Sequence, residues 1–259
     1  MVEGVEGVDG VALVTGAGRR IGRAIALELG ANGWTVAVHH GRSKAEADET
    51  AGLIKSRGGS ATTFAADLAD EIQVTDLATQ VAADIGPITC LVNNASLFEH
   101  DGAATVTQAS WDRHFAINLR APFVLIQAMA AGLPKGASGN VINLLDQRVW
   151  NLTPEFVSYT LTKTGLWTLT QTMAMALAPH IRVNGIGPGP VLASKSQTPA
   201  QFAAQVASTP LKQATTVEKI AEAVTFILGS PTMTGQMIAL DSGQHLDRGG
   251  KWQGGETDG

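Results

Sequence analysis

The sequence predicts an α/β fold in which one doubly wound parallel sheet carries helices on both faces. Short apolar runs alternate with longer segments of helical periodicity along most of the 259 residues. The apolar runs are continuous rather than alternating, which is typical of strands buried on both faces. No internal repeat or second-domain boundary interrupts this pattern, so one large domain is expected.

Seven apolar runs are predicted to be strands. They lie at Val11–Thr15, Thr35–His39, Ala61–Ala66, Ile88–Asn93, Asn140–Leu145, Ile181–Ile186 and Met237–Leu240. Right-handed crossovers between successive parallel strands then build a seven-stranded sheet of the Rossmann type.

Six segments are predicted to be helices, several of which end at glycine. They lie at Arg20–Ala31, Lys44–Arg57, Ile72–Ile85, Ser110–Ala131, Pro154–Ala178 and Val217–Leu228. Ser110 is the expected N-cap of the fourth. Pro188–Pro210 holds four prolines and is expected to form a loop with a short helix that covers the cleft. The domain should span residues 11–246, between flexible segments 1–10 and 247–259.

Composition excludes several classes of protein. The chain is 44% hydrophobic and 16% charged, with a net charge of −5 and no Lys/Arg-rich run, which argues against nucleic acid or an anionic membrane as partner. Cys90 is the single cysteine, so a disulfide framework and a cysteine metal site are excluded. No 18-residue apolar stretch is expected to span a membrane, and the N-terminus lacks the basic and apolar regions of a signal peptide. We therefore expect a cytoplasmic protein.

A glycine-rich turn, Thr15-Gly16-Ala17-Gly18-Arg19-Arg20-Ile21-Gly22, follows the first strand and opens a helix. Glycines let the backbone approach a pyrophosphate, and the helix N-terminus supplies N–H groups and the positive end of a dipole. This context favours a dinucleotide phosphate site over a tight turn without a ligand.

Tyr159 and Lys163 are four residues apart on a predicted helix, so their side chains share one face. A positive charge beside a phenol favours the phenolate, and the tyrosine could then exchange protons nearer neutral pH. Asp146 lies 13 residues before Tyr159, at the end of a predicted strand. A carboxyl group there could share a proton with the phenol or bind an N–C–N edge through paired hydrogen bonds.

Together these motifs resemble the short-chain dehydrogenase/reductase family over about Val11 to Gly243. Further segments fit the family's pattern in order: Asn93-Asn94-Ala95, Asn118, Tyr159 with Lys163, Arg182–Gly189 and Asp241-Ser242-Gly243. The resemblance implies Tyr159 as the proton donor and Lys163 as the group that tunes it and binds the nicotinamide ribose. It also implies that Asn118 holds a water that relays protons to Lys163.

Two departures resemble the pteridine reductase branch of this family. Arg20 replaces the second glycine of the turn, and Asp146 replaces the usual serine. Asn94–Phe98, His39–Ser43 and Gly185–Gly189 also look like segments of that branch. The resemblance implies that Phe98 stacks on a flat pterin ring while Asp146 assists protonation of an imine nitrogen. A loop-capping role for Asp146, a core Phe98 and a surface Arg20 are the alternatives.

The expected cofactor is NADP(H). An NAD site usually has an acidic residue at the end of the second strand, where this chain has His39 and His40. Arg42 and Ser43 instead offer a guanidinium and a hydroxyl that suit a 2′-phosphate, and Arg19 could add charge. Solvated charges at a helix start are the alternative.

The expected cofactor contacts follow from these motifs and the resemblance. They are Gly16, Arg19, Arg20, Ile21, His39, Arg42, Ser43, Asp67, Leu68, Asn94, Ala95, Ser96, Tyr159, Lys163, Pro188 and Gly189. The expected substrate contacts are Arg20, Ser96, Phe98, Asp146 and Tyr159, and no metal is expected.

Three functions remain open at this point. The first is NADPH-dependent reduction of a dihydropterin or dihydrofolate-like small molecule. The second is general carbonyl reduction of a 3-oxoacyl thioester or a sugar, and the third is a dinucleotide sensor without catalysis. The family resemblance further implies a homotetramer that is built through Ser110–Ala131 and Pro154–Ala178.

Overall fold

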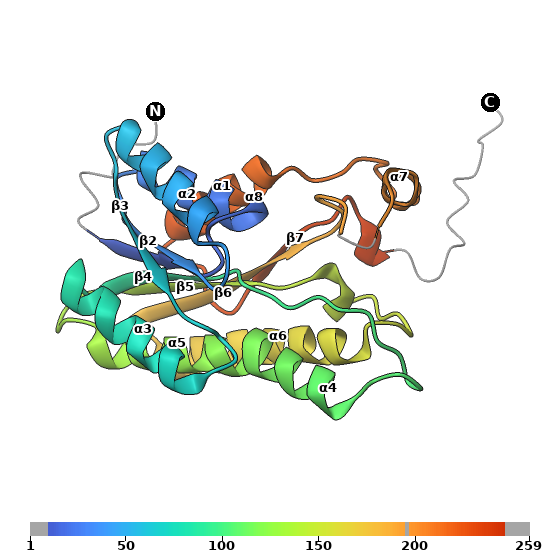
Figure 1. Cartoon of the computed structure of the whole chain (residues 1–259), viewed down its shortest axis with the longest axis horizontal. Coiled ribbons are helices and arrows are strands. Elements are labelled where there is room, and N and C mark those ends of the chain that lie inside the picture. Colours follow the sequence, from blue (N-terminus) through green and yellow to red (C-terminus); the bar gives the residue numbers. More distant parts are fainter. Residues whose placement is uncertain (1–9, 195–196, 247–259) are drawn as a thin grey trace.

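A computed structural model describes residues 10–194 and 197–246, and it confirms the predicted α/β fold (Figure 1). Seven parallel strands form one sheet in the order β3-β2-β1-β4-β5-β6-β7. The strands are β1 (Val11–Val14), β2 (Thr35–His40), β3 (Ser60–Ala65), β4 (Ile88–Asn93), β5 (Gly139–Leu144), β6 (Ile181–Pro188) and β7 (Met237–Leu240). The predicted flexible segments lie outside the described residues, except for Gly10.

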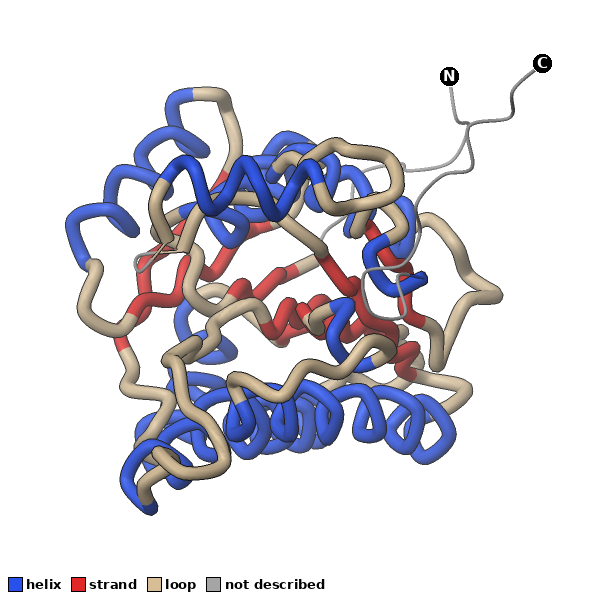
Figure 2. The backbone as a smooth tube through the Cα atoms, turned by 90° about the vertical axis from the view of Figure 1, so that its right-hand side faces the viewer, coloured by secondary structure: helices blue, strands red, loops and turns tan. Residues whose placement is uncertain are grey.

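Helices cover both faces of the sheet, as Figures 1 and 2 show. One face carries α1 (Arg20–Ala31), α2 (Lys44–Ser56) and α8 (Val217–Leu228). The other carries α3 (Glu71–Asp84), α4 (Gln108–Phe115), α5 (Ala121–Gly132) and α6 (Val157–Leu177). Each face of the sheet packs into its own apolar core: the first core lies beneath α1, α2 and α8, and the second lies beneath α3, α5 and α6. In β1, Ala12 and Val14 point into the first core while Val11 and Leu13 point into the second, because side chains alternate along a strand.

The predicted helix Ser110–Ala131 is interrupted by a π-helical turn, η1 (Ala116–Arg120), between α4 and α5. Pro122 has no N–H for the carbonyl of Asn118 four residues before it, and the wider turn falls at this point. The expected N-cap was wrong, because the Thr107 hydroxyl accepts the backbone N–H of Ser110 and the helix begins earlier.

The helical run Gln108–Gly132 contains an 18-residue window with a mean hydropathy of 1.3, which is enough by length and composition to cross a membrane. The expectation that no stretch would reach this level was therefore wrong. The run is apolar because it buries one face against the sheet and α3, where Leu125, Ile126 and Met129 join the second core.

The helix that carries Tyr159 and Lys163, α6, begins at Val157 rather than at the predicted Pro154. Phe156 precedes it in the left-handed region with φ of 58°, and its N–H donates to the Asp101 carbonyl over 2.7 Å. The Asp101 side chain accepts the N–H of Ser158, so a distant loop caps this helix. The loop after β6 contains the predicted short helix, α7 (Pro199–Ala207). Two further short helices are η2 (Gln147–Val149) and η3 (Gln244–Leu246).

Candidate active site

Two adjoining cavities lie at the carboxyl ends of the strands. The first, about 410 Å³, opens between the turn after β1 and the ends of β2, β3 and β4. The second, about 530 Å³, lies between the end of β5, the start of α6 and the loop after β6. Arg20 lines both cavities. The carboxyl edge of an open α/β sheet is where this architecture binds ligands.

The first cavity brings together most of the residues that were expected to contact the cofactor. Its lining includes Gly16, Arg19, Arg20, Ile21, His39, Arg42, Ser43, Asp67, Leu68, Asn94, Ala95 and Ser96. Pro188, Gly189 and Tyr159 line the second cavity instead. Lys163 and Asn118 line neither cavity and lie behind Tyr159 and Ser96, respectively.

The glycine turn is held close to the end of β4. Gly16 has φ of 64°, and a Cβ on Gly22 would collide with the Gly16 carbonyl oxygen. The Asn94 amide donates to the Thr15 carbonyl over 2.8 Å, so the turn and the end of β4 are tied together. The backbone can therefore approach a phosphate without side chains in the way.

His39 is buried and joins the glycine turn to the end of β3. Its Nδ1 accepts the N–H of Gly16 over 3.0 Å, and its Nε2 lies 3.1 Å from the Ala66 carbonyl. These partners require a neutral imidazole with the proton on Nε2. Burial lowers the pKa of His39 to about 4, despite the hydrogen bond to Ala66. His39 therefore holds the glycine turn against the end of β3, beneath the cavity, as an uncharged side chain.

His39 is expected to make the protein less stable in acid. Histidine in the unfolded chain has a pKa near ~6.5. At a pH between that value and about 4, His39 is therefore protonated in the unfolded chain but neutral in the native state. Lowering the pH from 7.5 to 5 should cost about 2 kcal/mol through this residue alone. Urea unfolding of His39→Asn should show a pH dependence that is weaker by that amount. The exposed His180→Asn is the control and should keep the dependence of the parent protein.

Arg42 and Ser43 stand at the start of α2, where the chain leaves the end of β2. Both line the first cavity, and among the described residues no carboxylate lies within 4.0 Å of the Arg42 guanidinium. Arg19 also lines this cavity, with its Nη1 3.9 Å from the exposed Glu46. This rim of the first cavity therefore presents positive charge and a hydroxyl group that could bind the phosphate on a ribose.

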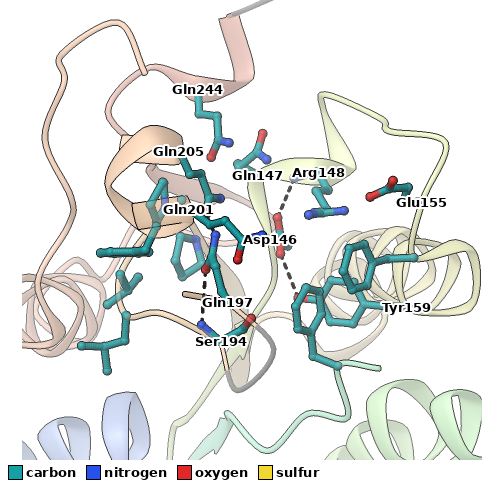
Figure 3. Close-up of a pocket in the computed structure, with 18 of the residues that line it drawn as sticks. Asp146, Gln147, Arg148, Glu155, Tyr159, Ser194, Gln197, Gln201, Gln205 and Gln244 are labelled. Atoms are coloured by element: carbon teal, nitrogen blue, oxygen red, sulfur yellow. Dashed lines mark hydrogen bonds between the residues drawn. The ribbon is translucent and has the colours of Figure 1, made fainter. Parts of the chain in front are cut away.

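Asp146 and Tyr159 are in direct contact (Figure 3). The phenol donates to Asp146 Oδ2 over 2.9 Å, while Asp146 Oδ1 accepts the backbone N–H of Arg148 over 2.9 Å. Burial raises the pKa of Asp146. Burial and the charge of Asp146 together raise the pKa of Tyr159 well above its usual value. The pair therefore retains a proton that it can give to a bound substrate.

Lys163 is buried beneath Tyr159. Its Nζ donates to the Leu144 carbonyl over 2.6 Å, and burial lowers its pKa to about 8. The expected lowering of the Tyr159 pKa by Lys163 is wrong. The ammonium lies 5.7 Å from the phenol ring centre, whereas the Asp146 carboxylate is bonded to the hydroxyl and acts in the opposite direction.

Asn118 links the loop after β4 to α6. Its Oδ1 accepts the N–H of Leu97 over 2.7 Å, and its Nδ2 donates to Leu97 and to Thr162 Oγ1. These contacts engage both polar atoms of the Asn118 side chain, and a relay water at this residue is not required to explain them. That role stays a prediction.

Phe98 lines the second cavity but already has an aromatic partner. Its ring is stacked on Phe156, with 4.4 Å between ring centres, and meets Tyr159 edge-on at 4.7 Å. The Arg148 guanidinium lies 4.7 Å from the Phe156 ring centre. One face of Phe98 is thus covered, and 40% of the residue remains exposed for contact with a flat ring.

Arg20 makes a contact that the sequence did not predict. Its guanidinium donates to the carbonyls of Leu192 and Ala193, over 3.1 and 3.0 Å, in the loop after β6. Arg20 has a φ of 53°, which lies in the left-handed region that glycine adopts most easily. This backbone conformation suits the glycine that the family pattern has at this position. Arg20 therefore connects the glycine turn to the wall of the second cavity, and its expected contacts with phosphate and substrate stay predictions.

The family is decided by sequence comparison. The profile of the short chain dehydrogenases matches residues 10–203. The chain belongs to the short-chain dehydrogenase/reductase family. The family expected from the turn, Asn118, Tyr159 and Lys163 is thereby confirmed.

Relatives of this short-chain dehydrogenase/reductase include enzymes with different substrates. L-xylulose reductase of Bos taurus is 35% identical over 240 residues, which cover 90% of this chain and 95% of the bovine one. The 3-oxoacyl-[acyl-carrier-protein] reductase FabG of Staphylococcus epidermidis is 31% identical over 243 residues, which cover 91% and 98% of the two chains.

A solved structure agrees with the branch that Asp146 and Arg20 indicated. The crystal structure of FolM alternative dihydrofolate reductase 1 from Brucella canis, complexed with NADP, has a TM-score of 0.90 and 47% identity to this chain. The match covers 93% of this chain and 95% of the Brucella one. The pteridine reductase-like branch is thus confirmed at the level of sequence and fold.

Several residues of the second cavity were not predicted from sequence. They are Gln147, Arg148, Glu155, Phe156, Val191, Leu192, Gln197, Gln201, Phe202, Gln205 and Gln244. Phe156 stands three residues before Tyr159, a helical spacing that could have indicated it. The glutamines come from three separate segments, and no local pattern marks them as neighbours.

Proposed function

We propose that this short-chain dehydrogenase/reductase is an NADPH-dependent reductase of dihydropterins. The observation that supports this most directly is the hydrogen bond between Asp146 and Tyr159, next to the exposed part of Phe98. A carboxyl–phenol pair can protonate a ring nitrogen or hold an N–C–N edge, and an aromatic side chain can stack on a flat heterocycle. The structure from Brucella canis, named as a dihydrofolate reductase and complexed with NADP, supports the same substrate class and cofactor.

The residues fit NADPH in the first cavity. Glycine-turn N–H groups would hold the pyrophosphate, and Arg42 with Ser43 would hold the 2′-phosphate, with Arg19 adding positive charge. Asp67 would meet the adenine at the end of β3. When bound, NADPH supplies the hydride, and the chain supplies the proton and the orientation of the acceptor.

In the second cavity, Tyr159 would protonate the imine nitrogen of the substrate while Asp146 stabilises the proton that the pair shares. A water held by Asn118 would relay a proton to Lys163, and Lys163 would return one to Tyr159 from the buried side. An imine requires protonation at nitrogen as hydride reaches carbon, and this is the chemistry that a carboxyl group assists and a serine hydroxyl does not.

The proposed function is tested by following the oxidation of NADPH with a panel of substrates. Dihydrobiopterin, biopterin, dihydrofolate and a β-ketoacyl thioester are offered in parallel. Turnover of the reduced pterins with little turnover of the thioester supports the proposal. Turnover of the thioester alone would assign the protein to the carbonyl reductases, a second candidate that the identity to L-xylulose reductase and FabG favours. No turnover with any substrate would favour a dinucleotide sensor.

Arg42→Ala is expected to weaken NADPH binding selectively. Losing a charge-assisted contact to the 2′-phosphate costs about 1.5–3 kcal/mol, so the KM for NADPH should rise about 10- to 100-fold. The KM for NADH should change little, because NADH has no phosphate at this position. Arg57→Ala, at the far end of α2, is the matched control and should leave both constants unchanged. Equal effects of Arg42→Ala on both cofactors would remove Arg42 from the phosphate site.

We also propose a cytoplasmic homotetramer that acts on a small molecule. Large apolar side chains remain exposed on the two helices that the family resemblance implicates, namely Trp111 on α4 and Leu161 and Met175 on α6. Such exposure is typical of an interface. Sedimentation velocity should give a species of four chains. A monomer at micromolar concentration would refute this proposal.

A further inference from the structure

Asp101, in the loop between β4 and α4, is a buried residue that lines neither cavity. Its Oδ1 accepts the backbone N–H of Ser158 over 3.1 Å, and its backbone carbonyl accepts the N–H of Phe156 over 2.7 Å. Within residues 10–194 and 197–246, the Ser158 N–H is the only hydrogen-bond partner of the carboxyl group, and no cationic side chain lies within 4.0 Å of it. The carboxyl group therefore serves the first turn of α6, where free N–H groups and the helix dipole favour an anion.

The segment that Asp101 holds has a constrained backbone. Phe156 has a φ of 58°, in the left-handed region that a bulky residue adopts only where its surroundings hold it there. Gly102 forms an isolated antiparallel bridge with Glu155. The loop between β4 and α4 therefore contacts the residue before Phe156 as well as the turn that follows it.

The first turn of α6 sets two contacts that line the second cavity. The Phe156 ring is stacked on Phe98, with 4.4 Å between ring centres. Tyr159 follows Phe156 by about one helical turn, and its hydroxyl donates to Asp146 over 2.9 Å. A shift of this turn would therefore move the proton donor and the stacked rings together.

Buried polar side chains attach the other end of the loop to the helices that follow it. Asn118 Oδ1, on η1, accepts the N–H of Leu97 over 2.7 Å. His114 Nε2, on α4, accepts the N–H of Glu99 over 3.3 Å. Both side chains are buried. The loop is thus fixed to α4 and η1 before it reaches Asp101, which supplies its contact with the start of α6.

We propose that Asp101 is a positioning residue for proton transfer: its carboxyl group fixes the first turn of α6 and so holds the Tyr159 hydroxyl on Asp146. The inference rests on the proposed function, because it assigns a further residue to the same reaction. Asp101 lines neither cavity, so it acts through the backbone of α6 rather than on the substrate. A small displacement of a reacting group slows the reaction strongly without preventing cofactor binding.

The kinetic test compares Asp101→Ala and Asp101→Asn with the native protein, using a 7,8-dihydropterin and saturating NADPH. Asp101→Ala removes the acceptor of the Ser158 N–H, and kcat should fall about 10- to 100-fold. Asp101→Asn keeps a carbonyl oxygen but loses the charge that strengthens the hydrogen bond, so its kcat should be intermediate. The dissociation constant of NADPH should be unchanged in both variants, because Asp101 does not line the first cavity.

The absorbance of the phenolate gives a second readout that does not require turnover. Tyr159 is the only tyrosine in the chain, and burial together with Asp146 raises its pKa. Loosening the first turn of α6 weakens both effects, so the phenolate should form at a lower pH in Asp101→Ala and at an intermediate pH in Asp101→Asn. A residue that served only the stability of the fold would leave this titration, and kcat per folded molecule, unchanged.

Thr216→Ala is the matched control, because the Thr216 hydroxyl caps α8 on the opposite face of the sheet. It should lower the free energy of unfolding while kcat and the Tyr159 titration stay native. A native kcat and a native titration in folded Asp101→Ala would overturn the proposal. If Asp101→Ala does not fold, native values in Asp101→Asn would overturn it and intermediate values would support it. If the native protein reduces no pterin, the proposed function fails, and the Tyr159 titration alone decides the role of Asp101.

Discussion

Tyr159→Phe is expected to lower kcat for dihydropterin reduction by about 10²- to 10⁴-fold, the usual contribution of a positioned proton donor. Phenylalanine keeps the ring that meets Phe98 edge-on and removes only the hydroxyl that donates to Asp146. The loss should therefore appear in kcat, while the dissociation constant of NADPH, measured by quenching of tryptophan fluorescence, should stay close to that of the native protein.

Two observations would contradict this expectation. Retention of more than about a tenth of the native kcat would assign proton transfer to another group, with Asp146 as the nearest candidate. Loss of NADPH binding would indicate a structural rather than a chemical role. Phe226→Leu, at an exposed position on α8, is a control at an aromatic residue away from the site and should not change kcat.

Asp146→Ser is expected to reduce kcat/KM for dihydropterins by about 10²- to 10³-fold, because serine can orient a substrate but cannot share the proton with Tyr159. NADPH binding should be unaffected, since Asp146 lines only the second cavity. Glu155→Gln removes another carboxylate from the same cavity, where it is exposed and makes no contact with Tyr159, and it should have a small effect. A fully active Asp146→Ser would remove the assigned role.

Asp146→Ser also tests directly what raises the pKa of Tyr159. Tyr159 is the only tyrosine in the chain, so its ionisation can be followed by the absorbance of the phenolate. Burial and Asp146 raise the pKa of Tyr159, and its phenolate should therefore appear only at a higher pH than that of a free tyrosine. Asp146→Ser removes the opposing carboxylate and should lower the pKa of Tyr159. An unchanged titration would show that burial alone sets it.

The sheet, the glycine turn and the two cavities were largely predictable, because periodicity and glycine spacing are local properties of the sequence. The first residues of the helices were less predictable. The beginning of α6 depends on Asp101, which reaches the helix from a distant loop, and that of α4 depends on which of two neighbouring hydroxyl residues becomes the cap. The direction of the Tyr159 pKa was also mispredicted, since burial and the exact position of Asp146 cannot be read from spacing.

The substrate side of the site shows the same limit more strongly. The glutamines Gln147, Gln197, Gln201, Gln205 and Gln244 of the second cavity come from three segments that meet only on folding. Arg20 was predicted to face phosphate and substrate, yet in the structure it holds the loop after β6 through two backbone carbonyls. Long-range contacts of this kind leave no periodic signal in the sequence.

The most direct test of the central claim is the ratio of kcat/KM for a 7,8-dihydropterin to kcat/KM for a β-ketoacyl thioester, measured with NADPH in the native protein and in Asp146→Ser. We predict a ratio well above one that collapses in the variant, because the carboxyl group serves imine protonation and not carbonyl reduction. A ratio below one in the native protein, or one that Asp146→Ser leaves unchanged, would contradict the account.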